Sequence, residues 1–388
     1  MSTVLVVNSG SSSLKYQLVA LPSGEAIASG LIERIGEEVG NARHTDADGT
    51  RETETTIPDH DTAMRLVLAV LPPSPPDAIG HRVVHGGDRF SEPTLITDEV
   101  CAVVQELSTL APLHNPANLA GIQASRAAFG DVPQVAVFDT AFHTTIPEHA
   151  WRYAVPPEWV TDYGVRRYGF HGTSHRYVGG ATARLLGRDP SDCDIIVLHL
   201  GNGASVSAIH GGVCVETSMG MTPLEGLVMG TRSGDIDPAV IAHLARHGMS
   251  IGDIDDALNT RSGLLGLCGE NDMRRVHELA ESGDAAARTA LDVYCHRIRK
   301  YVGAYLAVLG GADAIVFTAG VGENNPDIRA RGLSGLERLG IRLDPARNAF
   351  NEAIISDDDS PVTVCVVPTD EEHAIAEQTW ELVEGLAR

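Results

Sequence analysis

The sequence lacks features that mark several large classes of protein. Only two of its 29 basic residues are lysine, Lys15 and Lys300. Its six cysteines form no Cys-x-x-Cys pair, which argues against a zinc ribbon or a disulfide framework and suits a reducing compartment. The longest apolar runs, such as 4–7 and 195–198, are strand-sized and too short to cross a bilayer. The chain does not open with a basic region followed by an apolar stretch, so no signal peptide is expected and a cytoplasmic location follows.

The net charge is −23, and no basic stripe interrupts it. Nucleic-acid binding is not expected, because a phosphate backbone attracts clustered Lys and Arg. Association with an anionic membrane surface is disfavoured for the same reason. In a chain so rich in arginine, a lysine suggests a place where a compact ammonium charge is used. Lys300 lies in a predicted helix, whereas Lys15 follows a Gly/Ser turn and is harder to explain as a solvated surface residue.

A length of 388 residues predicts two domains. The apolar strand 4–7, a polar turn and the alternating segment 14–21 predict a β-hairpin, and a similar unit recurs at 194–209. This recurrence suggests two related domains. Strand-like and helical patterns alternate elsewhere, which indicates an α/β fold. The strand-like segments are 78–84, 134–138, 314–318 and 362–367, and the helical ones are 61–70, 116–128, 286–309 and 371–386. The acidic stretch 37–61 is expected to form an exposed hairpin or arm.

Three Gly/Ser/Asn turns directly follow apolar strands, at 8–13, 201–205 and 319–324. There is no G-x-x-x-x-G-K-[ST] motif, so a Walker A loop is excluded. Turns of this kind expose successive backbone N–H groups that can bind phosphate oxygens. Each one alone is better explained as an ordinary turn, but the three together, with Lys15 beside the first, favour nucleotide binding.

Histidine and arginine concentrate in glycine-flanked segments at 81–87, 113–116, 138–143, 168–175 and 229–235. Arg82 and Arg232 lie in apolar or Gly-rich surroundings, where an unpaired guanidinium is costly and needs an anion. That anion is either an internal carboxylate or a substrate carboxylate or phosphate. The segment 368–372 ends a strand and begins a helix, so its acids serve either as a helix cap or as Mg²⁺ ligands. The residues alone leave both alternatives open.

These segments together resemble the acetate kinase (acetokinase) family across nearly the whole chain. The matching stretches, in family order, are VNSGSSSLKYQL, GHRVVHGG, LAPLHNPAN, VAVFDTAFH, YGFHGTSH, HLGNGAS, ETSMGMTPLEGLVMGTRSGDIDP, VFTAGVGEN and PTDEE. The resemblance implies two duplicated ribonuclease-H-like domains of the actin-like ATPase type, with a nucleotide cleft between them. It places the first domain at 1–148 with the C-terminal helix 374–388. The second, at 149–373, would bind the nucleotide and form the interface of a homodimer.

The resemblance also implies the roles of individual residues in exchanging a phosphoryl group between ATP and acetate, giving ADP and acetyl phosphate. Mg²⁺, for which Mn²⁺ could substitute, would be held by Asn8 and Glu371. The catalytic residues would be Asp139, His171 and Arg232. The residues that contact acetate or acetyl phosphate would be Arg82, His114 and an apolar group of Val84, Leu113, Phe170 and Pro223. The residues that contact ATP or ADP would be Ser11, Ser13, Lys15, His199, Leu200, Gly201, Asn202, Gly203, Asp272, Met273, Arg274, Gly320, Val321, Gly322, Glu323 and Asn324.

Two departures from the family pattern are visible. The segment 269–274 is more acidic than expected, and Asp370 stands where Asn is common. Two alternative functions stay open. A propionate or butyrate kinase of the same family is one, because one methylene in an apolar pocket is worth only about 1–3 kcal/mol. An ATPase of the same superfamily that acts as a conformational switch is the other.

Overall fold

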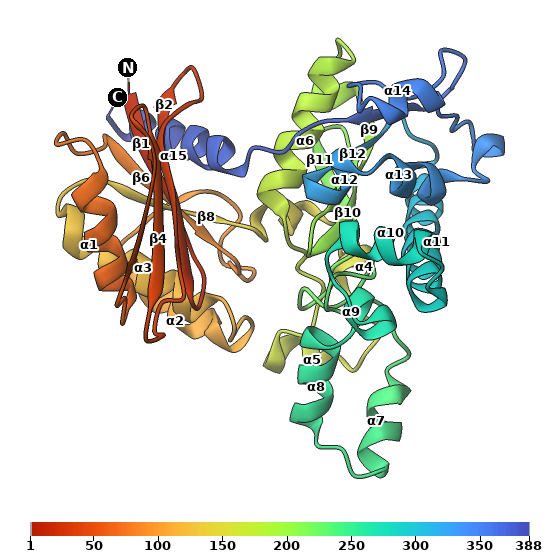
Figure 1. Cartoon of the computed structure of the whole chain (residues 1–388), viewed down its shortest axis with the longest axis horizontal. Helices are drawn as coiled ribbons and strands as arrows, with labels where there is room; N and C mark the ends of the chain where they lie inside the picture. The colour runs from red at the N-terminus through yellow and green to blue at the C-terminus, as the bar shows by residue number, and fades with distance from the viewer. Residues whose placement is uncertain (1, 388) are drawn as a thin grey trace. The chain divides into compact units, whose positions relative to one another are not determined.

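The computed structural model describes residues 2–387, and the chain divides into two compact units. The first unit extends to residue 142 and includes the chain from 370 onward, while the second covers 143–369. The resemblance placed the corresponding divisions at 148/149 and 373/374. Figure 1 shows the elements of both units along the chain.

The first unit is built on one mixed sheet. Within the described residues the sheet has eight strands in the order β5-β4-β3-β2-β1-β6-β8-β7. Its strands are β1 (Ser2–Ser9), β2 (Ser13–Leu21), β3 (Glu25–Glu33), β4 (Gly40–Asp46), β5 (Gly49–Thr55), β6 (Ala78–Val83), β7 (Thr94–Leu95) and β8 (Gln134–Phe138). Its helices are α1 (His60–Val70), α2 (Asp98–Glu106), α3 (Asn115–Phe129) and α15 (Glu371–Ala387).

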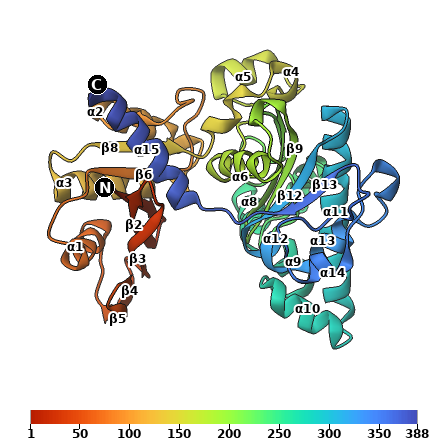
Figure 2. The same ribbon diagram turned by 90° about the horizontal axis from the view of Figure 1, so that it is seen from above.

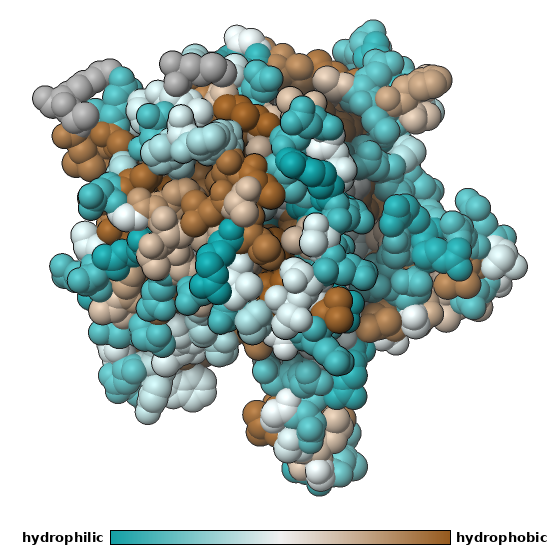
Figure 3. Space-filling model, turned by 60° about the vertical axis from the view of Figure 1, so that its left-hand side comes forward, coloured by the Kyte–Doolittle hydropathy of each residue, from teal (hydrophilic) through white to brown (hydrophobic). Residues whose placement is uncertain are grey.

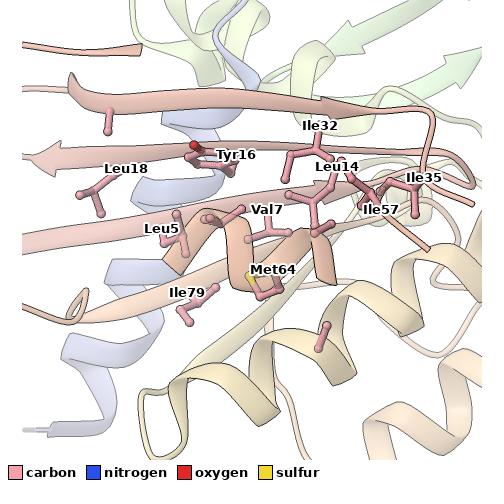
Figure 4. Packing of buried hydrophobic residues seen from close by; sticks show 14 residues of the cluster. Leu5, Val7, Leu14, Tyr16, Leu18, Ile32, Ile35, Ile57, Met64 and Ile79 are labelled. Carbon is pink, nitrogen blue, oxygen red and sulfur yellow. The ribbon is translucent and has the colours of Figure 1, made fainter. Parts of the chain in front are cut away.

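Side chains alternate in direction along β1, so this strand contributes to the core on both faces of the sheet. Leu5 and Val7 point to one face and pack in a cluster that includes Met64 of α1 and Ala124 of α3 (Figure 4). Val4 and Val6 point to the opposite face and pack against α15, and α1 and α15 accordingly lie on opposite sides of the strands in Figure 2. Burying each such side chain is worth about 1.5–3 kcal/mol. The C-terminal helix therefore completes the core of the first unit.

The second unit contains a smaller sheet of five strands within the described residues, in the order β11-β10-β9-β12-β13. Its strands are β9 (Asp194–Leu200), β10 (Ala204–His210), β11 (Val213–Thr217), β12 (Ala314–Thr318) and β13 (Thr363–Val366). Its helices are α4 (Glu148–Trp151), α5 (Pro157–Tyr163), α6 (Gly172–Leu185), α7 (Ala239–Arg246), α8 (Ile251–Thr260), α9 (Gly263–Cys268), α10 (Met273–Glu281), α11 (Ala285–Leu309), α12 (Ala319–Asn324), α13 (Pro326–Leu333) and α14 (Pro345–Ala349). Helix α6 packs on β9 and β12, and α11 packs on β9 and β10 from the other side (Figure 2).

The two sheets repeat one topology. In the first, β3, β2 and β1 are antiparallel neighbours, and β6 and β8 continue in parallel beside β1. In the second, β11, β10 and β9 are antiparallel neighbours, and β12 and β13 continue in parallel beside β9. The recurring hairpins of the sequence are thus the first two strands of each sheet. The predicted α/β fold with two duplicated ribonuclease-H-like domains is confirmed.

Most predicted elements are present with small shifts at their ends. The stretch 37–61 does form a hairpin, and β4 and β5 extend the edge of the first sheet beyond β3. The segment 319–324 is different, because it forms the short helix α12 instead of an open turn. The backbone reverses at Ala319, whose φ is +63°, and the Glu323 carboxylate accepts the Ala319 N–H at 2.7 Å. That side chain closes the turn into a helix.

No helix in the part of the chain that the structure describes is long and apolar enough to cross a membrane. Figure 3 shows hydrophilic and hydrophobic side chains interspersed on one face of the molecule. Several large apolar residues are nevertheless exposed around α7 and α8, among them Val240, Met249 and Ile251. Helix α7 has no buried residue.

Candidate active site

The turn between β1 and β2 holds the first group of predicted residues. Asn8 and Lys15 are directly opposite each other across the hairpin, so their side chains share one face of the sheet. The Gly10 N–H donates to the Ser13 carbonyl at 2.8 Å, which leaves Ser11 exposed at the tip. The Lys15 ammonium forms an ion pair with Glu372 in the first turn of α15. The hairpin and α15 therefore meet at this lysine.

Arg82, Asp139 and Glu371 come from three elements of the first unit and lie together. Arg82 is on β6, and its guanidinium donates to the Asp139 carboxylate through Nε at 3.0 and 3.1 Å and through Nη2 at 2.8 Å. Asp139 directly follows β8 and is 2% exposed. Arg82 Nη1 also lies 3.5 Å from Glu371 Oε2. Of the two anions that the sequence allowed for Arg82, an internal carboxylate is therefore present and binds one edge of its guanidinium.

Burial and charge oppose each other in this pair. Burial raises the pKa of the Asp139 carboxyl, and the neighbouring Arg82 guanidinium acts against that shift. Although burial disfavours the charged form of Arg82, Asp139 and Glu371 together raise the pKa of its guanidinium above the usual range. Arg82 therefore remains a fixed positive charge, and its side chain is partly exposed whereas that of Asp139 is buried.

Two asparagines hold the loop that follows Arg82, and the sequence reasoning did not single them out. Asn118 accepts the Val84 N–H at 3.0 Å and donates to the Ser9 carbonyl at 2.7 Å. Asn115 exchanges two hydrogen bonds with the backbone of His85. Both are buried in α3. The available signal was their place in the LHNPAN segment, where two amides occur three residues apart on one helix.

The acids at 370–372 have different roles. The Asp370 carboxylate accepts the His373 N–H at 2.9 Å, which is a helix N-cap interaction. Glu371 faces Arg82, and Glu372 is paired with Lys15. Of the two explanations that the sequence left open, the cap applies to Asp370. Glu371 instead lies beside Arg82, which also binds the Asp139 carboxylate.

His171 and Arg232 lie close to each other in the second unit. A Cβ atom built on Gly203 would be 3.5 Å from both His171 Nε2 and Arg232 Nη1. The absence of a side chain at Gly203 therefore leaves room between the imidazole and the guanidinium. His171 has a φ of +58° directly before α6, a conformation that costs energy for a residue with a side chain and concentrates at functional sites.

Arg232 has no carboxylate within ion-pair distance among residues 2–387. Its Nη1 lies 3.3 Å from the Pro223 carbonyl oxygen and 3.9 Å from Met229 Sδ. Burial lowers the pKa of its guanidinium, with no acidic neighbour to oppose the shift. A half-buried cation with such partners is costly unless an anion binds it. Unlike Arg82, Arg232 has the environment expected of an anion-binding residue.

Side chains of α11 form hydrogen bonds with both ends of the loop that carries Arg232. The Asp235 carboxylate accepts the Gly226 N–H at 2.9 Å and the Tyr301 hydroxyl at 3.0 Å. Arg297 donates to the Gly226 carbonyl at 2.9 Å. The Gly230 N–H, within the loop, donates to the Asn202 carbonyl at 3.0 Å. These contacts fix the backbone on either side of Arg232.

A cavity of about 620 Å³ opens in the second unit between the turn after β9, helix α12 and the start of α10. Its lining includes these residues that the resemblance assigned to the nucleotide: Gly201, Asn202, Asp272, Met273, Arg274, Gly320, Val321 and Asn324. Other lining residues were not predicted: Gly230, Leu264, Asn271, Tyr294 and Asn325. Leu264 and Tyr294 are apolar or aromatic positions of helices, and nothing in their local sequence distinguishes them from core residues.

Some residues assigned to the nucleotide are turned into the protein. Leu200 is fully buried, and the Glu323 carboxylate accepts the N–H groups of Ala319 and Thr369. His199 is 7% exposed, and its ring stacks on that of His171 with centroids 4.3 Å apart. Asp272 caps α10 and pairs with Arg274. Hydrogen bonds with Arg274 lower the pKa of the Asp272 carboxyl to about 2.

The residues proposed to contact the acid substrate are divided between the two units. In the first, Val84 is half-buried, Leu113 is 66% exposed, and His114 directly precedes α3. In the second, Pro223 lies beside Arg232 through its carbonyl, and Phe170 is 2% exposed.

The chain is similar to known proteins over nearly its whole length. The model of the acetokinase family matches residues 3–377. An acetate kinase of Leifsonia xyli subsp. xyli is 59% identical over 99% of both chains. The crystal structure of Porphyromonas gingivalis acetate kinase superposes with a TM-score of 0.95 at 44% identity, covering 99% of this chain and 100% of the other. A propionate kinase from Francisella tularensis superposes with a TM-score of 0.93 at 40% identity, covering 98% and 100%.

Proposed function

Because the chain belongs to the acetokinase family, we propose that it is an acetate kinase. It transfers the γ-phosphoryl group of ATP to a carboxylate oxygen of acetate, giving ADP and acetyl phosphate, and catalyses the reverse reaction. The transfer is direct and in line, without a phosphorylated enzyme. The observation that carries this proposal is Arg232, a half-buried guanidinium without a carboxylate partner among residues 2–387. It lies beside His171 and two residues from Gly230, which lines the cavity of about 620 Å³.

The mechanism relies on positioning and charge. The phosphoryl group passes through a loose transition state whose negative charge is spread over its oxygens. Arg232 and His171 are two donors that face the same space at Gly203, so they stabilise this charge. Arg82 binds the carboxylate of acetate or the phosphoryl group of acetyl phosphate. Asp139 holds the Arg82 guanidinium through two parallel hydrogen bonds, which fixes its orientation.

Mg²⁺ is the proposed metal, and Mn²⁺ is expected to substitute for it. Asn8 would supply an amide oxygen and Glu371 a carboxylate. The Asp139 carboxylate lies in the same group, because Arg82 contacts both Asp139 and Glu371. Oxygen ligands of this kind suit Mg²⁺, which typically binds one or two protein carboxylates together with substrate phosphates and water. When bound, the metal neutralises charge on the phosphates. Arg82 Nη1 lies 3.5 Å from Glu371 Oε2, so it would help to orient that carboxylate toward a metal.

The cavity of the second unit is the proposed site of ATP or ADP. The turn residues Gly201 and Asn202 and helix α12 line it, and the capped start of α10 forms another wall. Lys15, Ser11 and Ser13 of the first unit are proposed to contact the phosphates. Lys15 is 52% exposed at its side chain and keeps Glu372 as a partner, so phosphate binding exchanges one anion for another.

Propionate is the second candidate substrate, and the likeness to the propionate kinase of Francisella tularensis favours keeping it. An additional methylene changes binding in an apolar pocket by only about 1–3 kcal/mol. Leu113 and Val84, with their exposed apolar surface, are the side chains whose size would set this preference.

We further propose that the protein is a cytoplasmic homodimer. The exposed apolar residues around α7 and α8 support an interface there, because large apolar side chains that gather on a surface typically mark a contact with another chain. Ile251 is 61% exposed, and Ile236, Val240 and Met249 are exposed near it in sequence.

The test is to trap acyl phosphate with hydroxylamine in the presence of Mg²⁺ and ATP, using acetate, propionate and butyrate in parallel. Acetate is expected to give the highest rate, and Arg232→Ala is expected to abolish it. Arg65→Ala, which removes an exposed arginine of α1, is the matched control and should retain full activity. A preference for propionate would change the substrate and keep the mechanism. ATP hydrolysis without acyl phosphate, equal in both variants, would replace the kinase with an ATPase switch.

A further inference from the structure

Ser205 lies between two histidines in the second unit. Its Oγ is 2.9 Å from His171 Nδ1 and 2.7 Å from His175 Nε2. Ser205 is on β10, and both histidines are at the start of α6, one turn apart. Ser205 and His175 are fully buried. The three polar groups therefore form a short chain that ends on the side chain proposed to contact the phosphoryl group.

A serine hydroxyl donates one hydrogen bond and accepts others, so the chain has few proton arrangements. If the hydroxyl accepted from both imidazoles, its own proton would be left without an acceptor in a fully buried site. If it donated to His175 Nε2, the His175 proton would be on Nδ1, which has no hydrogen-bond partner among the described residues. A buried N–H without an acceptor is rare in folded proteins, rarer than a buried acceptor without a donor.

One arrangement leaves no buried N–H or O–H unpaired. His175 carries its proton on Nε2 and donates it to Ser205, and Ser205 donates its own proton to His171 Nδ1. The bare Nδ1 of His175 is then the atom without a partner. A protonated His175 would place a second, unpaired N–H in the core, and burial lowers the pKa of His175 well below its ordinary value. The neighbouring His143 and His199 act in the same direction.

We infer that Ser205 and His175 are positioning residues that hold His171 as the neutral tautomer with its proton on Nε2. This inference rests on the proposed function for the role of His171. The Nε2–H then points to the space at Gly203 that Arg232 Nη1 also reaches. The imidazole donates a hydrogen bond to the transferring group without accepting one from it. Arg232 supplies the positive charge, and the His171 Nε2–H supplies a hydrogen bond in a fixed direction.

The tautomer can be measured in the resting protein by ¹⁵N–¹H correlation NMR of the imidazoles at pH 8, with His171→Gln to assign the signals. His171 is expected to show a protonated Nε2 and a bare Nδ1. Ser205→Ala should shift the ring to a mixture of tautomers. Ser207→Ala is the matched control, because Ser207 is equally buried on β10, two residues further along, and its hydroxyl bonds to Thr217 on the neighbouring strand β11. It should leave the His171 signals unchanged.

Kinetics provide the second readout. Ser205→Ala is expected to lower kcat about tenfold with the KM for acetate nearly unchanged, because a misdirected donor acts mainly in the transition state. Ser205→Thr, which keeps the hydroxyl, should restore most of the rate, and Ser207→Ala should match the wild-type protein. In a His171→Gln background, Ser205→Ala should have no further effect, whereas a purely structural role would lower the rate again.

A protonated Nδ1 on His171 in the wild-type protein would overturn the inference, as would equal rates for the two serine variants. These outcomes are separate from failure of the proposed function. If His171→Gln retained full acyl phosphate formation, the role of His171 would be wrong even where NMR showed the expected tautomer.

Discussion

At the scale of single residues, the two arginines that the sequence singled out are in opposite situations. Arg82 is bound by Asp139 through three short contacts and lies near Glu371. Within the described residues, Arg232 forms no ion pair with a carboxylate, and its Nη1 contacts the Pro223 carbonyl and the Met229 sulfur. A guanidinium without an internal anion lowers stability when it is buried, which is why we propose that Arg232 binds an anionic ligand. Arg82 also contributes to the fold of its own unit.

This contrast predicts opposite effects on stability. Asp139→Ala removes the partner of a largely buried guanidinium and is expected to lower the free energy of unfolding by about 2 kcal/mol or more. Arg232→Ala removes an uncompensated charge and is expected to change it by less than about 1 kcal/mol, in either direction, while activity falls by about 10³ or more. Urea denaturation and the hydroxamate assay on both variants measure the two quantities. Equal destabilisation of the two variants would show that Arg232 has a structural partner.

At the scale of elements, the glycine-rich loop from Gly226 to Asp235 is held in one conformation by hydrogen bonds to α11 and by the close packing of its glycines. Two of its glycines have positive φ, +110° at Gly226 and +66° at Gly234. A Cβ atom at Gly234 would lie 2.3 Å from the Leu227 carbonyl oxygen. Glycine is therefore needed there for close approach as well as for conformation, and the approach sets the position of Arg232.

Gly234→Ala is expected to lower both stability and kcat. The positive φ alone costs about 1–2 kcal/mol for a residue with a side chain, and overlap with the Leu227 carbonyl adds to that. Gly248→Ala is the matched control, since Gly248 has a φ of +95° but nothing within 4 Å of a built Cβ. It should show the conformational cost alone and normal kcat. If both variants lost the same stability and neither lost activity, the close packing of the Arg232 loop would be unimportant.

At the scale of the whole molecule, buried histidines link stability to pH. Burial lowers the pKa of His81 to about 4, with a hydrogen bond to Gln134 acting against it, and burial lowers the pKa of His143 to about 4 as well. Burial also lowers the pKa of His175. The unfolded chain, with an ordinary histidine pKa near 6.5, therefore binds protons at a higher pH than the folded protein does. The stability that these neutral histidines contribute is fully present above about pH 6.5 and is lost as the pH decreases toward 4.

Urea denaturation at pH 7.5 and pH 5.5 tests this sign. Each of the buried histidines is expected to remove about 1 kcal/mol of stability between these values, since one pKa unit corresponds to about 1.4 kcal/mol. His81→Gln should make the decrease smaller by about that amount. A stability that stays constant or rises on acidification would contradict the account.

Much of this fold was predictable from local patterns in the sequence. The strands at 134–138 and 314–318 have the predicted bounds, because short buried β-branched runs bounded by turns are a clear signal. The two hairpins predicted the duplicated topology. The short helix at 319–324 was not predicted, since it depends on the Glu323 side chain folding back onto its own backbone.

The candidate site was predictable where a motif is continuous and was missed where it depends on distant residues. Arg82 and Arg232 were visible as arginines in apolar or glycine-rich surroundings, and His171 as a histidine in a glycine-flanked segment. The partners that hold them come from elsewhere in the chain: Asn118 holds the β1 and Val84 backbones, and Tyr301 holds Asp235 across 66 residues. No local pattern identifies such pairs, because tertiary packing alone brings them together.

The most direct test of the central claim is to follow ATP, acetate and Mg²⁺ with the purified protein by ³¹P NMR. The account predicts that ADP and acetyl phosphate appear in equal amounts, that neither appears without acetate, and that Arg232→Ala forms neither at a comparable rate. Formation of ADP and inorganic phosphate in equal amounts, independent of acetate and of Arg232, would contradict it.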